Sequence, residues 1–166
     1  MPPYRDLYPD FPIVRRQQWG AWEPRFSGKM WFPLSYIHTS YTNTATCLRP
    51  DNCRKELLFL QRFHMRNCPD IKHNFLISKS GKVFEGRGWL AKPSLPGRHR
   101  DIQYTSLYIG FIGMFKDELP NEKMMEAKEA ILKLGIKHNF IRKTFLEFDL
   151  QGESLIENEG LYRYYQ

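Results

Sequence analysis

The sequence lacks any run of 18 consecutive apolar residues, so no segment is expected to cross a membrane as a helix. Residues 1–6 also lack the apolar stretch of a signal peptide, which predicts either a cytosolic chain or an excised part of a larger one. With 166 residues, 42% of them hydrophobic, the chain can form one folded domain. We assign that domain to residues 13–166, after an extended lead-in of residues 1–12.

Concentrated charge is also missing. The 25 Lys and Arg residues outnumber the 18 Asp and Glu residues, an excess that would suit nucleic acid, an anionic lipid surface or an acidic small ligand. No run of basic residues reaches five, however, and no aromatic stripe is interleaved with them. A solvated surface is therefore the favoured interpretation, and nucleic-acid binding is the least favoured function.

The common signatures of zinc sites, Cys-x-x-Cys and His-Glu-x-x-His, do not occur. Cys47 and Cys53 are close enough for a local disulfide, but the spacing leaves two incidental thiols equally open, and Cys68 stands alone. A histidine taken by itself is more often structural than functional. The sequence contains five histidines, His38, His64, His73, His99 and His138.

The hydrophobic pattern predicts an α/β fold with a central mixed β-sheet flanked by helices. The strand over Ser106–Phe115 is so apolar that we expect it at the centre of the sheet. A second helix is expected to follow Asn121 and to end at Gly135 in a left-handed conformation. The other expected elements are strands at Pro33–His38 and Lys143–Leu150, a hairpin over Phe75–Phe84, a helix at Arg54–Arg66 and a weak helix at Leu155–Tyr164.

Five separate motifs occur in a defined order along the chain. They are IVRRQQWGA at 13–21, YIHTS at 36–40, CPDIKHNFLI at 68–77, VFEGRGW at 83–89 and SLYIGFIGMF at 106–115. Together they resemble the peptidoglycan recognition protein family, and the resemblance covers about residues 13–135. It implies the fold of the N-acetylmuramoyl-L-alanine amidases, in which a groove on one face of the sheet holds muropeptide.

In catalytic members of that family the groove carries a zinc ion bound by two His and one Cys, with a Tyr assisting. The open position on such a zinc makes water nucleophilic near neutral pH. This chain departs from the set: Ile37 falls on the first metal His, His73 on the Tyr and Phe148 nearest the second metal His, while residues 151–156 contain no Cys. The resemblance therefore implies no catalytic residue, metal or cofactor, and a degenerate amidase using His38 and His73 is the less favoured alternative.

The resemblance also implies which residues line the groove. Four fall on groove-lining positions, namely His38, Thr39, His64 and His73. Arg87 matches the position associated with diaminopimelate-type muropeptides, whose extra carboxylate a guanidinium can bind in a bidentate manner. The alternative for Arg87 is a structural role, such as pairing with Glu85.

The loop after Trp89 departs from the family pattern. Residues 90–101 form a loop about two residues longer than usual, with two prolines, which predicts a narrowed or filled groove. His99 is the candidate for the groove histidine of this loop. Arg98 and Arg100 are candidates to contact a ligand carboxylate that a partner presents.

This combination is similar to the ectodomains of insect transmembrane peptidoglycan receptors, which act in innate immunity. It implies an extracellular domain of a plasma-membrane protein that forms a heterodimer with a peptidoglycan-binding receptor isoform. The heterodimer would assemble around monomeric diaminopimelate-type muropeptide, that is, tracheal cytotoxin. The alternative is an inhibitory decoy that binds partners without ligand. The family also carries a disulfide at the spacing of Cys47 and Cys53, in keeping with an oxidising environment.

Overall fold

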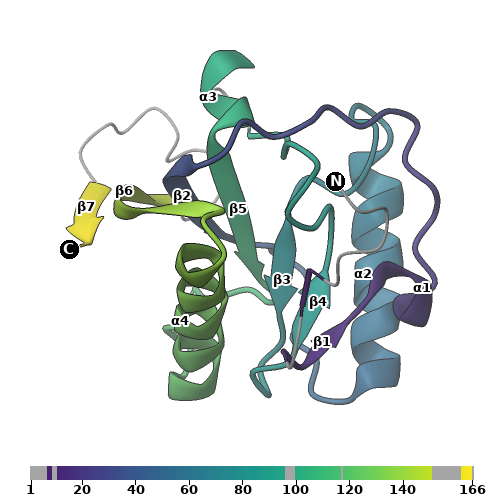
Figure 1. The fold of residues 1–166 in the computed structure, drawn as a ribbon. Coiled ribbons are helices and arrows are strands. Elements are labelled where there is room, and N and C mark those ends of the chain that lie inside the picture. The colour runs from purple at the N-terminus through teal and green to yellow at the C-terminus, as the bar shows by residue number, and fades with distance from the viewer. Residues whose placement is uncertain (1–6, 9–10, 96–99, 117, 151–161, 166) are drawn as a thin grey trace.

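One sheet of seven strands organises the computed structural model, which describes residues 7–8, 11–95, 100–116, 118–150 and 162–165 (Figure 1). Residues 100, 149–150 and 162–165 are described by their backbone alone. The strand order across the sheet is β1-β4-β3-β5-β2-β6-β7. β4 runs antiparallel to β3, and β7 to β6, while the other neighbours are parallel. The predicted mixed sheet is therefore confirmed.

The predicted strands, the hairpin and the two long helices are present, with shifted ends. The strands are β1 (Ile13–Val14), β2 (Leu34–Tyr41), β3 (Phe75–Ile77), β4 (Val83–Glu85), β5 (Ser106–Phe111), β6 (Ile141–Leu150) and β7 (Tyr162–Tyr165). The helices are α1 (Arg16–Trp19), α2 (Pro50–His64), α3 (Arg100–Tyr104) and α4 (Glu122–Lys137). Among the described residues, no helix has the length and apolar character needed to span a membrane.

β5 lies at the centre of the sheet, and all of its residues are buried, as its apolar run predicted. It ends at Phe111 rather than at Phe115. β2 extends past the predicted His38 to Tyr41, because it pairs with β5 on one side and with β6 on the other. This central three-strand unit sets which side chains face each side of the sheet.

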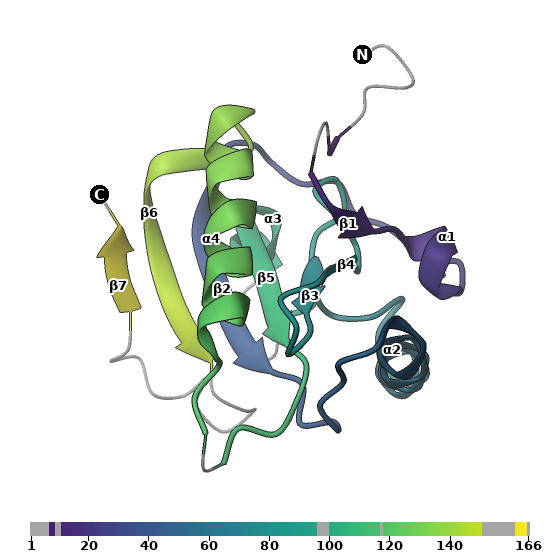
Figure 2. The same ribbon diagram turned by 90° about the horizontal axis from the view of Figure 1, so that it is seen from below.

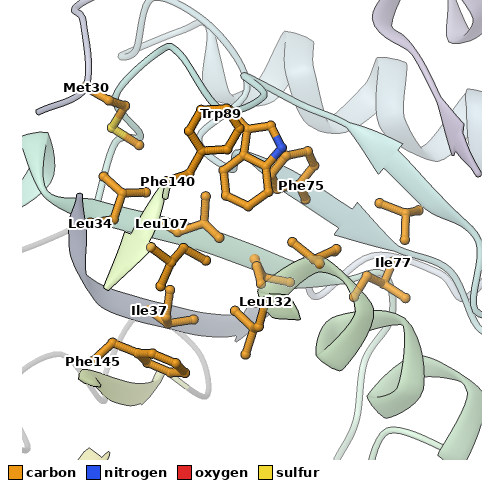
Figure 3. Packing of buried hydrophobic residues seen from close by; sticks show 14 of the residues in the cluster. Met30, Leu34, Ile37, Phe75, Ile77, Trp89, Leu107, Leu132, Phe140 and Phe145 are labelled. Atoms are coloured by element: carbon orange, nitrogen blue, oxygen red, sulfur yellow. The ribbon is translucent and has the colours of Figure 1, made fainter. Parts of the chain in front are cut away.

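The two faces of the sheet carry separate cores, one beneath α4 and one beneath α2 (Figure 2). Side chains of a strand alternate between faces, so Phe75 and Ile77 belong to the α4 core while Leu76 belongs to the α2 core. Figure 3 shows the α4 core, in which Trp89 and Phe140 pack near Phe75. An ion pair between Lys128 of α4 and Glu147 of β6 is buried on the same face.

The start of α2 is tied to the preceding loop by a disulfide. Cys47 and Cys53 are bonded, with their Cα atoms 5.1 Å apart, which confirms the pairing implied by the family resemblance. α2 begins at Pro50 rather than at the predicted Arg54, because proline is well suited to the first turn of a helix. Cys68 is a free cysteine of intermediate exposure.

The predicted helix-ending role of Gly135 is wrong, because α4 continues through it to Lys137. A Cβ atom at Gly135 would lie 2.4 Å from Cδ1 of Ile141 and 2.7 Å from Cη2 of Trp89. Glycine is therefore required at this position for the close approach of α4 to β6 and Trp89, and not for a left-handed backbone.

Both ends of the chain differ from the sequence-based expectation. In the lead-in, Tyr8 is buried, its hydroxyl donates to Glu85, and its ring packs edge-on against Phe75 at 6.1 Å. The weak helix expected over Leu155–Tyr164 is wrong at its end, where residues 162–165 form β7 beside β6. Residues 155–161 lie outside the described residues.

Gly135→Ala is expected to lower the free energy of unfolding by about 1–3 kcal/mol, because the added methyl group overpacks the contact with Ile141 and Trp89. Helix propensity alone predicts the opposite sign, since alanine is favoured over glycine by about 1 kcal/mol in a helix. Urea unfolding followed by circular dichroism distinguishes the two. Glu126→Ala, on the exposed side of the same helix, is the control, and a stabilised Gly135→Ala variant would contradict the packing argument.

Candidate functional site

A buried polar cluster lies on the α2 side of the sheet, where β2 passes β5. His38 and Ser40 alternate with Ile37 and Thr39 along β2, so the two pairs face opposite sides of the sheet. The hydroxyl of Ser40 donates to the Tyr108 hydroxyl at 2.8 Å. Sequence reasoning missed Ser40 and Tyr108, since only the register of β2 against β5 brings them together.

His73 is the centre of this cluster. Its Nε2 lies 3.3 Å from Oγ of Ser40, and its ring packs against Tyr108 with centroids 4.2 Å apart. The ring has room because position 110 is a glycine, where a Cβ atom would lie 2.7 Å from Cδ2 of His73. His64 of α2 approaches from the other side, with its ring centroid 5.7 Å from that of His73.

Burial keeps both of these histidines neutral. Desolvation, with further repulsion from Lys72 and Arg87, lowers the pKa of His64 to about 3. Desolvation is also the largest cause that lowers the pKa of His73 well below its usual value, followed by repulsion from His64. Neutral His64 accepts a hydrogen bond at Nδ1 from the amide of Lys72 at 3.0 Å. The cluster therefore holds imidazoles as neutral hydrogen-bonding groups.

His38 is completely buried beside an aromatic ring. Its imidazole stacks on Phe148 of β6, with centroids 4.9 Å apart and planes 9° apart, and its Nε2 lies 3.1 Å from Oγ of Ser106. The neighbour that β6 supplies to His38 is thus a hydrocarbon ring.

The geometry corrects one assignment made from the motif. Ile37, on which the first metal histidine was placed, points into the core beneath α4, whereas His38 is the β2 histidine on the site face. Thr39 lies on the face of Ile37, so the structure does not bring it together with the histidines. A zinc site needs at least three donors, and in the part of the chain that the structure describes no three His, Cys, Asp or Glu residues form such a group. The described residues therefore do not supply the donors of such a zinc site.

A leucine of the long loop covers the cluster. Leu95 packs on Tyr108 in a small buried group against which Phe148 also packs, and only 4% of Leu95 is exposed. The amide of Leu95 donates to Oε1 of Gln103 at 3.0 Å. This arrangement, which we call the Leu95 plug, places the leucine against Tyr108 and Phe148, and Phe148 in turn stacks on His38. The narrowing of a ligand groove by the loop stays a prediction.

Arg87 holds the loop that carries the plug. Its guanidinium donates to the carbonyls of Ile71 at 2.6 Å and Lys92 at 2.7 Å, to Oγ of Ser94 at 2.8 Å and to the carbonyl of Asp70 at 3.4 Å. Burial lowers the pKa of Arg87, and the Asp70 carboxylate opposes that shift. Four of its donor contacts are therefore internal, and the role of Arg87 in binding a muropeptide carboxylate stays a prediction.

The remaining predicted residues belong to the same loop. Arg98 and His99 lie outside the described residues, and Arg100 begins α3 with its side chain not described. A bridge between Lys29 and Ala91 anchors the loop at its start. The stacked rings of Trp31 and Tyr104, 4.3 Å apart, hold its end.

Comparison with known proteins identifies the family. Peptidoglycan recognition protein 1 of Mus musculus is 31% identical over 137 residues, which cover 80% of this chain and 73% of that protein. Peptidoglycan-recognition protein 2 of Holotrichia diomphalia is 33% identical over 136 residues, covering 80% and 71%. The chain belongs to the peptidoglycan recognition protein family. No family model matches the chain.

Solved structures of peptidoglycan recognition proteins share the fold. The ectodomain of the Drosophila transmembrane receptor PGRP-LCa superposes with a TM-score of 0.78 at 27% identity, covering 82% of this chain and 83% of that one. Peptidoglycan recognition protein LE in complex with tracheal cytotoxin gives a TM-score of 0.77 at 27% identity, covering 83% and 81%. The amidase-like fold implied by the motifs is thereby confirmed.

The two buried histidines predict a loss of stability in acid. In the unfolded chain they titrate near 6.5, so between that pH and about 3 the unfolded state binds more protons and the free energy of unfolding falls. Urea unfolding at a series of pH values should show this fall, and a His64→Gln/His73→Gln variant should show a shallower one. His138→Gln is the control.

NMR of the histidine rings tests the same point without substitution. The His64 resonance is expected not to titrate between pH 7 and about pH 4. A midpoint near pH 6.5 would contradict a desolvated His64.

Arg87→Met is expected to lower the free energy of unfolding by about 2–4 kcal/mol, because buried acceptors on the loop lose their donor. Hydrogen exchange supplies the specific readout, since the amides of Ser94 and Leu95 should exchange faster once the loop is released. Arg66→Met, an exposed arginine, is the control. Unchanged exchange at Ser94 and Leu95 would contradict the clamp.

Proposed function

We propose that the chain is a non-catalytic co-receptor domain that senses peptidoglycan outside the cell. It joins a muropeptide-loaded partner of its own family and does not take up the ligand alone. In this proposal it is the ectodomain of a plasma-membrane receptor of innate immunity, most like the a-type isoform of the LC receptor. Assembly outside the cell is the signal passed to the inside.

The observation that carries the proposal is the Leu95 plug. A muropeptide seated over His38 and His73 would have to displace Leu95 from Tyr108 and Phe148. Displacement would expose the buried leucine and break the contacts that Arg87 makes to the loop. The plug therefore supports a domain that does not bind muropeptide alone and whose partner binds it instead.

The chemistry of the site supports a domain without amidase activity. The stacked Phe148 stands where β6 passes His38, and its ring cannot ligate a metal ion. The chain has three cysteines, namely the bonded pair Cys47 and Cys53, and Cys68. None of them follows β6 in the sequence.

Structural relatives support the partner. One of them is a complex of the ectodomains of PGRP-LCa and PGRP-LCx with tracheal cytotoxin bound, to which this fold is similar with a TM-score of 0.77 at 26% identity. By analogy, we propose that a ligand-binding family member presents diaminopimelate-type muropeptide to the loop at residues 90–101 of this chain. Arg98 and Arg100 are then the candidates to pair with the carboxylates of the presented ligand.

Analytical ultracentrifugation tests the proposal directly. The chain is mixed with a ligand-binding sister domain such as the PGRP-LCx ectodomain, with and without tracheal cytotoxin, and is also run alone with the ligand. A heterodimer that forms only with tracheal cytotoxin is expected. A heterodimer that forms equally without ligand would replace this proposal with the decoy, and tight binding by this chain alone would overturn the role of the plug.

Removal of the Leu95 side chain provides a second test of the proposal. Leu95→Ala is expected to create weak direct binding of tracheal cytotoxin, seen by calorimetry, because the side chain covering Tyr108 is truncated. Leu90→Ala is a matched control, since Leu90 lies in the same loop and is 43% exposed.

A further inference from the structure

The outward face of α2 is basic and aromatic, so the expectation that no aromatic residues are interleaved with the basic ones is wrong here. Four exposed residues of α2 and Arg66, just beyond its end, form one stripe, which we call the α2 stripe: Lys55, Phe59, Arg62, Phe63 and Arg66. Phe59 is 61% exposed and Phe63 is 51% exposed, an unusual amount of aromatic surface for one side of a helix. Apolar rings flanked by positive charges are therefore presented to solvent.

Two of these arginines are held in place by aromatic rings. The guanidinium of Arg62 lies 5.0 Å from the ring centroid of Trp22, and that of Arg66 lies 5.6 Å from the centroid of Phe63. Such cation–π contacts reduce the conformational freedom that an arginine loses when it binds a carboxylate. The α2 stripe is thus partly ordered for an acidic partner.

The outward face of α4 has the complementary character. Six residues along one side of this helix form what we call the α4 stripe: Glu122, Met125, Glu126, Glu129, Ala130 and Lys133. Its three glutamates outnumber its one lysine in a chain whose net charge is +7. Met125 is 40% exposed, and a flexible thioether packs well against aromatic rings.

Each stripe brings like charges together. Arg62 lies in the last turn of α2 with Arg66 two residues beyond the end of that helix, and Glu122 and Glu126 are four residues apart within α4. Like charges at this spacing destabilise a helix by about 0.2–0.5 kcal/mol per pair. Contact between the two stripes would replace both repulsions with attraction and would cover Phe59 and Phe63.

The two stripes cannot meet within one molecule, because α2 and α4 pack on opposite faces of the sheet (Figures 1 and 2). We propose that the α2 stripe of one copy docks on the α4 stripe of a second copy of this chain. The contact is heterologous and leaves a free stripe at each end, so it propagates head to tail. It goes beyond the co-receptor role, since it needs no muropeptide.

The complementary charge of the α2 and α4 stripes favours a second copy of this chain, and not a lipid surface, as the partner. An anionic membrane would use the α2 stripe and leave the acidic α4 stripe unused. The self-contact uses both charge signs and both apolar centres. Anchoring of many copies in one membrane would raise their effective concentration and strengthen a weak contact of this kind.

Sedimentation of the chain alone, over a concentration series at low and high salt, tests the proposal. The average mass is expected to rise above the monomer mass of 19.9 kDa with concentration at low salt and to return toward it at high salt. Two charge-reversed variants are made, Arg62→Glu/Arg66→Glu on α2 and Glu126→Lys/Glu129→Lys on α4. Each alone should lose association by about tenfold or more.

Mixing the two variants is the decisive measurement. One variant then has two acidic stripes and the other two basic stripes, so the mixture should associate although neither variant does so alone. Arg142→Glu/Lys143→Glu, on exposed residues of β6, is the matched control and should associate like the unmodified chain. A chain that stays monomeric at low salt, or a mixture that shows no rescue, would overturn the proposal.

Two further outcomes separate this contact from others. Binding to vesicles of anionic lipid that is lost only in the α2 variant, with no self-association, would assign the α2 stripe to a membrane instead. The α4 variant should still form the ligand-dependent heterodimer, so failure of the self-contact and failure of the co-receptor proposal are distinguishable.

Discussion

The pairing of β2 between β5 and β6 is the constraint on which the rest of the structure depends. Because side chains alternate along a strand, a shift of one residue would exchange the two faces of β2. In the register observed, Ile37 enters the core beneath α4 while His38 meets Phe148 and Ser106. One strand therefore defines both the hydrophobic layer beneath α4 and the buried polar layer on the other face of the sheet.

That polar layer is held together by contacts among its own side chains. His64, His73 and Tyr108 remain buried together, and their hydrogen bonds and ring contacts make the cluster part of the packing. Arg87 is likewise engaged in internal contacts, because its guanidinium donates to three backbone carbonyls and a serine hydroxyl.

Much of the fold was predictable from local pattern. The apolar run of β5 indicated the sheet centre, and the separated motifs identified the family and its disulfide. Three features were not predictable, because each depends on a partner distant in sequence. They are the face of the sheet to which Ile37 points, the continuation of α4 through Gly135 and the burial of Tyr8. The loop length did not identify Leu95 as the buried residue of the loop, because its contacts with Tyr108 and Phe148 depend on how the loop folds over β5 and β6.

The Leu95 plug also acts as an intramolecular competitor. A side chain tethered a few residues from its anchor is present at an effective concentration on the order of millimolar, whatever the amount of protein. If muropeptide binds where Leu95 packs, a free muropeptide at micromolar concentration would compete with Leu95 at a large disadvantage. In the proposed co-receptor, the response would then be determined by the concentration of loaded partners and not by dissolved fragments.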